Sequence, residues 1–446
     1  MSKKIIVLLF VCIGLLQTCN TTEPPPPEKT ITLSLEDAAS IEAWIKLITT
    51  NLQLPTTVTL KQSATGGNSV TQDIILSYAD TVIYIDSLLP NTTYSFHAVI
   101  QPSNQAEVKS NVLNVTTMDT TSHNFTWQTF TFGEHSSSVL RDVAIINENN
   151  IWAVGEIYMN DSLGQPDPRP YGAIHWDGVT WTPIKVPYHD FGSTNKFPRP
   201  LKTILAFDED NIYVTSSANL LKLEGDEWIE KAFFMKSIPF DGQVLKMWGT
   251  DSNNIYCVGR NGAIYRYNGT LWWKMSSGTD LHIYDIWGDY NENTGEWEVL
   301  AVASKRAVNF DKNILKINKT NKVTLLFTSG IPYSIHGIWF KNKACYVVGS
   351  GMYKKYDMTS SLAWEAIHHG ISNYYLDAIR GNDLNDIVAC GAFGELLHFN
   401  GVSWKSYIDI TYINGAIGGI DIKSNLVSCV GLKDNQAIVL IGRRTS

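Results

Sequence analysis

The segment VLKMWGTDSNNIYCVGRNGAIYRYNGTLWWKM, from Val244 to Met275, is the clearest guide to the fold of this 446-residue chain. Short runs rich in apolar and aromatic residues alternate in it with turn-forming residues such as Gly and Asn. The runs are Val244–Trp248, Asn254–Val258, Ala263–Tyr267 and Leu271–Met275. The segment therefore predicts four short strands joined by tight turns.

The same pattern recurs from about residue 125 to the end of the chain. Repeats of about 40–50 residues that carry four strands are typical of β-propeller blades. We expect seven blades, with six or eight as alternatives. The fourth copy fits worst, because an Asn-rich insert at Tyr290–Gly295 delays its second strand. The first strands of the blades begin near Leu140, Leu201, Val244, Ile283, Ile335, Leu376 and Ile417.

The last repeat is incomplete and tests the propeller interpretation. It runs from Ile417 to Ile441 and stops before any Gly-x-x-Trp strand. The segment Asn124–Phe130 has the missing aromatic pattern, with Trp127 in the expected place. We therefore predict that this N-terminal strand completes the last blade, which closes the ring and removes open sheet edges.

A Gly-x-x-Trp turn leads into the last strand of several blades. An Asn or Asp before the Gly favours a tight turn with positive φ. The turns resemble a degenerate Asp-box, the Ser-x-Asp-x-Gly-x-x-Trp hairpin of sialidase-type (BNR-like) and related assembly-factor propellers. Where that box has Asp, this chain has Trp176, Leu223, Tyr267 and Phe399. Asp-boxes are structural even in sialidases, so the resemblance implies a fold and carries no catalytic residue over.

The stretch from residue 31 to 118 has about seven short alternating runs and predicts a small β-sandwich. Its segment Leu88–Phe96 has the order Leu-x-Pro-x-Thr-x-Tyr. This order resembles the tyrosine corner of fibronectin type III domains, an immunoglobulin-like family in which the Tyr hydroxyl, here that of Tyr94, bonds back to the backbone. Val115–Thr117 resembles the last strand of that family, and we expect Trp44 to be the core aromatic.

The N-terminus predicts export. Lys3 and Lys4 precede the apolar run Ile5–Leu16, which has the length of a signal-peptide core and is short for a membrane span. The following Leu-Gln-Thr-Cys sequence resembles the bacterial lipobox, which implies a lipid on Cys19, with ordinary signal-peptidase cleavage as the alternative. We expect a signal peptide at 1–18, a Pro-rich tether at 19–30, the sandwich at 31–118 and the propeller at 119–446. The predicted location is the outer membrane or cell surface, alternatively the periplasm or the medium.

Composition excludes some functions. The formal net charge of −8 argues against nucleic-acid binding, which needs a basic surface. Four Cys residues lie on the second strands of four repeats, where neighbours are apolar, so we expect buried free thiols. They lack the spacing of a zinc site, and we predict neither a metal nor a cofactor. These residues are Cys257, Cys345, Cys390 and Cys429.

The non-repeating loops carry the candidate binding residues. Propellers usually bind at one face, and two long inserts of that face, Glu156–Gly172 and Val186–Pro200, are neighbours. Exposed aromatic and His side chains suit a protein or glycan ligand, since flat rings give contact area at little entropic cost. Alternatively, these rings hold their own loops in place. The candidates are Tyr158, Tyr171, Tyr188, His189, Phe191, Arg199, His369, Tyr374, Tyr375 and Tyr412.

An enzymatic function is the alternative. Sialidase chemistry would need an Arg cluster, a Tyr nucleophile and its Glu partner around the central channel. Asp142, Asp285 and Asp377 could line that channel as the carboxylates of a glycoside hydrolase or lyase, although solvated channel residues are expected from the repeat. The second positions of the first strands form a chemically mixed ring of Arg141, Lys202, Leu245, Tyr284, His336, Asp377 and Gly418.

A recurring Trp follows the first strand of three repeats. Trp248, Trp287 and Trp339 could form an aromatic ring around a ligand, but packing between blades is the favoured interpretation. Taken together, the sequence predicts an all-β, lipid-anchored envelope protein whose propeller binds protein or glycan without catalysis. A structural scaffold for envelope assembly is a further alternative, and the oligomeric state stays open.

Overall fold

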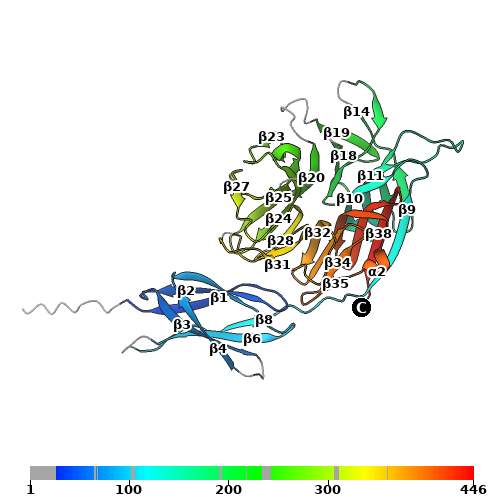
Figure 1. The fold of residues 1–446 in the computed structure, drawn as a ribbon. Helices are drawn as coiled ribbons and strands as arrows, with labels where there is room; N and C mark the ends of the chain where they lie inside the picture. Colours follow the sequence, from blue (N-terminus) through cyan, green and yellow to red (C-terminus); the bar gives the residue numbers. More distant parts are fainter. Residues whose placement is uncertain are drawn as a thin grey trace, which may run out of the picture.

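The computed structural model describes residues 27–64, 67, 69–101, 106–189, 193–216, 218–233, 243–305, 311–358 and 360–445. The predicted signal peptide, Cys19 and most of the tether lie outside these residues. The described chain forms two β-rich parts, an N-terminal pair of sheets and a larger ring of sheets (Figure 1). The prediction of an all-β, propeller-like protein is confirmed.

Two antiparallel sheets make up the N-terminal part, which we call the sandwich. One has the order β1 (Thr30–Ala38), β2 (Ala43–Thr50) and β5 (Asp80–Ile85). The other has the order β4 (Ser69–Leu76), β3 (Thr56–Ala64), β6 (Thr93–Ile100) and β7 (Val108–Lys109), and β8 (Leu113–Thr116) also pairs with β6. Side chains of both sheets share one apolar core.

The sandwich core differs from the sequence prediction at one position. Ile45 and Leu47 of β2 point into the core, so Trp44 points to the opposite side, because successive side chains of a strand alternate. Trp44 is 3% exposed and packs against the ring of sheets, so its assignment as the core aromatic was wrong. The Tyr94 hydroxyl accepts a hydrogen bond from the Leu89 amide at 2.8 Å, as a tyrosine corner requires.

Seven four-stranded antiparallel sheets follow among the described residues. Sheets one to three, each ordered from inner to outer strand, are β10 (Val139–Asn147), β11 (Asn150–Ile157), β12 (Tyr171–Trp176), β13 (Trp181–Ile184); β16 (Thr203–Ala206), β17 (Ile212–Thr215), β18 (Asn219–Glu224), β19 (Glu227–Phe233); and β20 (Val244–Asp251), β21 (Asn254–Gly259), β22 (Ile264–Tyr267), β23 (Trp272–Met275).

The remaining four sheets continue in chain order. They are β24 (His282–Asn291), β25 (Glu296–Ser304), β26 (Lys312–Ile317), β27 (Val323–Leu326); β28 (Ile335–Lys341), β29 (Ala344–Gly349), β30 (Gly351–Lys355), β31 (Glu365–Ala366); β32 (Leu376–Asp383), β33 (Asp386–Gly391), β34 (Leu396–Phe399), β35 (Trp404–Ser406); and β36 (Gly415–Lys423), β37 (Leu426–Lys433), β38 (Gln436–Arg444), β9 (Phe125–Phe132).

The sheets succeed one another around a ring, and the inner strands of neighbouring sheets contact each other, β36 and β10 included (Figure 1). The outer strand of the last sheet is β9, which precedes all the others in the chain. It pairs with β38 from Phe125↔Arg444 to Phe132↔Ala437. This pairing confirms that an N-terminal strand completes the last repeat.

Aromatic rings pack on glycines between neighbouring sheets. A Cβ built at Gly288 would lie 2.3 Å from the Trp248 ring, and one at Gly381 would lie 2.7 Å from the Trp339 ring. In each pair the Trp belongs to one sheet and the Gly to the next, so only Gly leaves room for the ring. Packing between sheets, the favoured interpretation of the recurring Trp residues, is confirmed for Trp248 and Trp339.

The Gly-x-x-Trp turns also have the predicted geometry. Gly178, Gly269 and Gly401 have φ values of 96°, 88° and 96°. The side-chain oxygen of the preceding Asp or Asn accepts backbone N–H groups of the turn; Asp177, for instance, accepts from Val179 and Thr180. Each turn is thus held by its own first residue.

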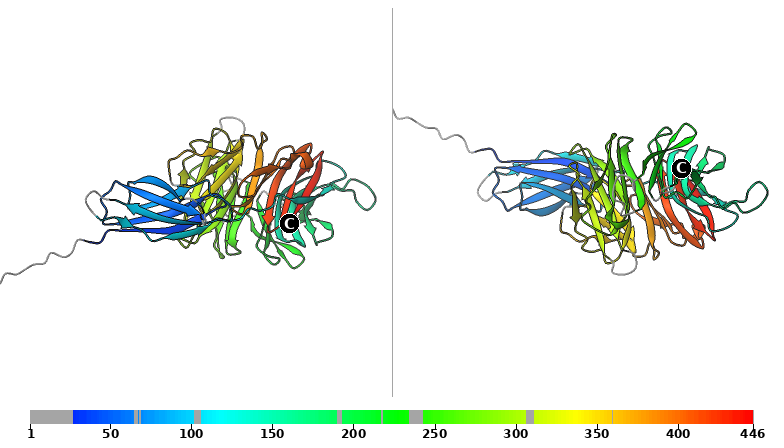
Figure 2. Two further views of the ribbon diagram at one scale, coloured as in Figure 1. Left: turned by 90° about the horizontal axis from the view of Figure 1, so that it is seen from below. Right: turned by 90° about the horizontal axis from the view of Figure 1, so that it is seen from above.

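The sandwich docks on the ring through a buried polar and aromatic cluster. Glu42 is 7% exposed, and both its carboxylate oxygens lie 3.0 Å from Lys354 Nζ. The hydroxyls of Tyr356 and Tyr84 donate to its Oε1 at 2.5 Å and 3.0 Å. Trp44 packs beside both tyrosines, with ring centroids at 5.5 Å and 5.7 Å. The two parts lie against each other in all three views (Figures 1 and 2).

The Asn-rich insert of the fourth repeat contributes to the same docking. It lengthens the hairpin of β24 and β25, and Asn293 Nδ2 at its tip lies 3.2 Å from both the backbone oxygen and Oε2 of Glu36 in β1. Lys343, in the corresponding turn of the next sheet, lies 2.9 Å from Glu36. The insert that distinguishes the fourth repeat from the others is thus the part of it that contacts the sandwich.

Trp127→Ala should weaken the closure of the ring. The Trp127 ring lies over Gly442, and the Phe125 and Tyr407 rings flank it with centroids at 5.6 Å and 5.4 Å. We expect a loss of about 3 kcal/mol in the free energy of unfolding, measured with urea, because truncation leaves a cavity. Thr126→Ala, at an exposed site of the same strand, is the control and should cost far less. Equal stability of the two variants would contradict this role.

Glu42→Ala should loosen the sandwich from the ring. It leaves Lys354, which is 9% exposed, buried without its carboxylate. Breaking a buried ion pair in this way costs about 3–5 kcal/mol, so we expect a loss of that order in urea unfolding and faster proteolysis of the linker at 119–124. Glu209→Ala, at an exposed turn of the second sheet, is the control. Unchanged proteolysis of the Glu42 variant would show that the docking does not depend on this pair.

Candidate functional site

The connections of the ring lie at its two ends. In an antiparallel sheet successive connections alternate between ends. The connections from second to third strand and from outer strand to the next sheet therefore share one end, which we call the loop face. The sandwich contacts the other end, at the turns around Asn293, Lys343 and Gly401. All candidate residues within the described ranges lie on or beside the loop face.

The candidates of the first two sheets mostly hold their own loops. Tyr188, in the hairpin of β14 (Pro187–His189) and β15 (Lys196–Pro198), is 6% exposed, and its hydroxyl donates to the Pro200 oxygen at 2.9 Å. His189 Nδ1 lies 2.8 Å from Glu230 Oε1. For these two residues the hydrogen bonds fit the alternative interpretation, in which the rings fix their loops. Phe191 lies outside the described residues.

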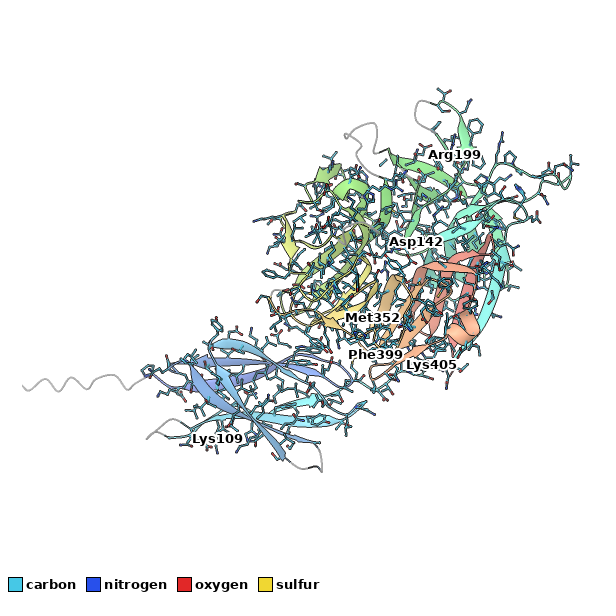
Figure 3. The ribbon with its side chains drawn as sticks, viewed as in Figure 1. Lys109, Asp142, Arg199, Met352, Phe399 and Lys405 are labelled. Carbon is cyan, nitrogen blue, oxygen red and sulfur yellow. The ribbon has the colours of Figure 1, made fainter. Side chains whose placement is uncertain are left out.

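Tyr158, Tyr171 and Arg199 are half-buried. The Tyr158 hydroxyl lies 3.4 Å from Glu156 Oε2, and burial, followed by the Glu156 charge, raises the pKa of this Tyr. The Tyr171 ring lies under Lys185 Nζ at 4.9 Å. Arg199 directly follows β15, in the connection between β13 and β16, at one edge of the ring (Figure 3). These side chains leave only part of their surface to a ligand.

An exposed patch of large side chains lies over sheets five to seven. Tyr374 is 37% exposed, and its ring lies 5.3 Å from that of Phe393, which is 45% exposed. Ile410 in α2 (Ile408–Thr411) is 67% exposed, and Tyr412 just after it is 62% exposed. We call these four residues the exposed patch. Of them, sequence reasoning selected Tyr374 and Tyr412; Phe393 follows a second strand, and its place in the repeat could have revealed it.

The loops that carry the exposed patch are joined by backbone hydrogen bonds. The Ala392 amide donates to Tyr375 O at 2.9 Å, and the Phe393 amide donates to Gly415 O at 2.9 Å. The Ile413 amide in turn donates to Phe393 O at 3.0 Å. The patch is therefore presented on fixed backbone. His369 is exposed nearby and lies beside His368, with ring centroids 4.3 Å apart, and Tyr375 is half-buried.

The residues at the second positions of the seven first strands, which the sequence predicts to form a chemically mixed ring, lie around one cavity. Each of the seven residues lines this cavity of about 330 Å³ at the loop-face end of the central channel, which we call the channel mouth. The ring of Tyr284 lies 4.4 Å from that of His336, and His336 Nδ1 lies 3.6 Å from Asp377 Oδ1. Sequence reasoning therefore identified the lining of this cavity.

Deeper in the channel, carboxylates are locked in ion pairs. Asp285 accepts two hydrogen bonds from Arg380, each at 2.8 Å, and one from the Ile338 amide at 3.0 Å. Asp142 accepts from Lys246 Nζ and from Thr203 Oγ1, each at 2.6 Å. Asp142 lies towards the inner strands in Figure 3.

The two carboxylates are 4% and 2% exposed, so the expectation that Asp285 and Asp142 are solvated was wrong. The repeat places them where the next sheet supplies N–H donors, and cations cross the channel to them. Burial disfavours the charged form of Asp285, but the Arg380 charge and hydrogen bonds outweigh it, and the pKa of Asp285 lies below its usual value. A buried carboxylate that is held in this way by an ion pair and hydrogen bonds is poorly placed to act as an acid or a nucleophile.

Other sequence predictions concern thiols, metals and membrane spans. Cys257, Cys345, Cys390 and Cys429 are buried and free, as expected, and burial raises the pKa of each thiol. Within the described ranges, no cluster of three His, Cys, Asp or Glu side chains could hold a metal ion. Within the same ranges, no helix is long and apolar enough to cross a membrane.

Comparison with known proteins supports the fold. No protein-family model matches the chain, and no curated protein matches it. A solved structure described as YCF48 bound to D1 peptide is similar to it, with a TM-score of 0.51 and 15% identity over 72% of this chain and 95% of that one. A computationally designed protein, Ika8, has a TM-score of 0.43 and 14% identity, over 69% and 98% of the two chains. The likeness to YCF48 supports a propeller-like fold for this chain, and at 15% identity it shows nothing more.

Arg380→Met should strip Asp285 of its counter-charge. Leaving a buried carboxylate unpaired costs about 3–5 kcal/mol at neutral pH, which urea unfolding would measure. In the parent the pKa of Asp285 is lowered on folding, so its contribution to stability is lost as pH falls. In the variant burial raises that pKa, so stability is lost as pH rises, and the two proteins should converge in stability on acidification.

Arg443→Met, at a half-exposed arginine of β38, is the control. It should cost little and follow the pH trend of the parent. A constant difference in unfolding free energy between Arg380→Met and the parent from pH 4 to 8 would contradict the ion-pair account.

Proposed function

We propose that this chain is an exported, lipid-anchored envelope protein whose seven-bladed propeller binds a segment of another protein at the loop face, without catalysis. The observation that carries this proposal is the exposed patch of Tyr374, Phe393, Ile410 and Tyr412 on loops with fixed backbone. Exposed aromatic side chains on a rigid support favour binding, because little conformational entropy is lost when a partner covers them.

The class of partner is inferred partly from the fold. The structure described as YCF48 bound to D1 peptide is one case in which a similar fold holds a peptide. We infer the same class of ligand here, a peptide segment, in preference to a glycan. The commitment of Asp142 and Asp285 to ion pairs supports a binding role over glycoside hydrolysis in the channel.

The sandwich suits the role of a spacer. We propose that it is a fibronectin type III-like domain spanning residues 31–118, since its sheet orders and its Tyr94 bond fit that family. It contacts the ring near Ala38 and Ala43, whereas Thr30 and Thr50 pair at the other end of β1 and β2, about 25 Å away. A lipid on Cys19 and a tether at 19–30 would thus leave the loop face on the side away from the sandwich.

Removing the exposed patch should abolish peptide binding. We would select ligands for the full-length protein from a random-peptide display library and measure their affinity by titration calorimetry. Tyr374→Ala, Phe393→Ser and Tyr412→Ala should each weaken binding about tenfold or more, because central aromatic contacts contribute about 2 kcal/mol. Tyr78→Ala, at a 75% exposed site of the sandwich, is the matched control.

A glycan array probed with the same protein separates the two classes of ligand. Peptides whose affinity depends on the exposed patch would support the proposal. Glycans that bind through the patch, or peptides that bind equally well to all three variants, would contradict it.

A further inference from the structure

Three cations gather on one side of the channel mouth. Arg141 belongs to β10, Lys202 directly precedes β16, and Arg260 begins the 3₁₀ helix η1 (Arg260–Gly262) between β21 and β22. These are the first three sheets of the ring, so the cations are neighbours around the channel. All three line the same cavity of about 330 Å³.

The acids of the channel mouth do not neutralise this group. Asp142 and Asp285 are already paired with Lys246 and Arg380. Asp377 lies beside His336 on the far wall. The third carboxylate that lines the mouth, Asp377, thus belongs to the sixth sheet, across the channel from the first three sheets.

Glu156 neutralises one member of the group. Its Oε1 lies 2.5 Å from Arg141 Nη2. Within the described ranges, the side chains of Lys202 and Arg260 have no hydrogen bond and no ion pair. The Glu156 charge acts on Lys202 as well as on Arg141, so one carboxylate faces three cations.

The cations repel one another. Burial lowers the pKa of Lys202 and the charge of Arg141 lowers it further; the Glu156 charge opposes this shift, and the charge of Arg260 adds to it. Burial followed by the charge of Arg260 also lowers the pKa of His282. Like charges held together at a partly buried site cost stability, and such a cost is typical of residues kept for binding.

The cavity has room for a small ligand and a closed floor. Lys246 and Arg380 line both the channel mouth and the deeper cavity of about 210 Å³, so the ion-pair layer separates the two. At Gly418, on the wall formed by the last sheet, a Cβ would meet no heavy atom within 4 Å. A ligand can therefore enter from the loop face and stop at the level of the ion pairs.

We propose that the channel mouth binds a small oxyanion, a carboxylate or a phosphate group, through Lys202 and Arg260 with support from Arg141. Charge-assisted hydrogen bonds from ammonium and guanidinium groups are the strong contacts that such a group takes. The inference does not require the partner to be a protein. If a peptide binds the exposed patch, an acidic side chain or its terminal carboxylate is the group that this site would receive.

Titration calorimetry of the full-length protein with inorganic phosphate and with citrate, at low ionic strength, tests the proposal. We expect binding of at least one of them that weakens with added NaCl, and the preferred anion separates the phosphate source from the carboxylate source. Lys202→Met and Arg260→Gln should each weaken it about tenfold or more, since hydrogen bonds to charged groups have this magnitude. Lys322→Met, at an exposed turn of the opposite end, is the control and should bind like the parent.

Two further measurements separate binding from a structural role. Without ligand, Lys202→Met and Arg260→Gln should keep or raise the thermal unfolding midpoint, because each removes repulsion. Gly418→Asp places a carboxylate in the open space of the mouth and should compete with added anion, again weakening its binding about tenfold. Failure of both anions to bind at millimolar concentration, or a loss that Lys322→Met shares, would overturn the proposal. A lowered midpoint together with unchanged binding in Gly418→Asp would do the same.

Discussion

The ladder between β9 and β38 is the interaction on which the rest of the structure depends. It joins the first strand of the ring to the last, so the seventh sheet gains its fourth strand and every sheet has neighbours on both sides. It also fixes where the linker leaves the ring. The Thr445 amide donates to Asn124 O, and the Thr121 amide to Asn400 O, at 2.9 Å and 3.1 Å. The chain that precedes β9 is thus held against sheet six, and the sandwich has to dock beside sheets four to six.

The sandwich and the ring are joined by a buried interface. Period-two alternation in β2 sends Ile45 into the sandwich and Trp44 outward, and the outward face meets Tyr356 and Lys354 of the fifth sheet. The carboxylate of the buried Glu42 accepts hydrogen bonds from Lys354 and from two tyrosine hydroxyls. These contacts explain how a charge is tolerated there. Because this contact uses the end of the ring opposite the loop face, both proposed binding regions stay uncovered by the sandwich.

Charges in the channel follow two different rules. At depth, Asp142 and Asp285 accept from the next sheet and from cations across the channel, and burial makes any unpaired charge there costly. At the mouth, Arg141, Lys202 and Arg260 lie together with Glu156 as the one carboxylate described beside them. The ion pairs at depth stabilise the ring, whereas repulsion between the cations at the mouth lowers its stability. We therefore place function at the mouth and at the exposed patch and not in the repeat.

The sequence by itself determined the architecture, because blade strands and turns are local patterns. Alternating runs, Asn-Gly turns and the missing last strand were enough to predict the four-stranded repeats, the closing role of Trp127 and the set of residues around the channel mouth. Tertiary structure decided which of those residues are available. Tyr188 and Tyr374 look alike in the sequence, yet one donates to Pro200 and the other faces solvent. The sequence predicts that Asp142 is a solvated channel residue, but in the structure it is bonded to Lys246 and Thr203 from two other sheets. Burial and charge pairing depend on residues 60 or more positions apart, and no local pattern records which of them meet.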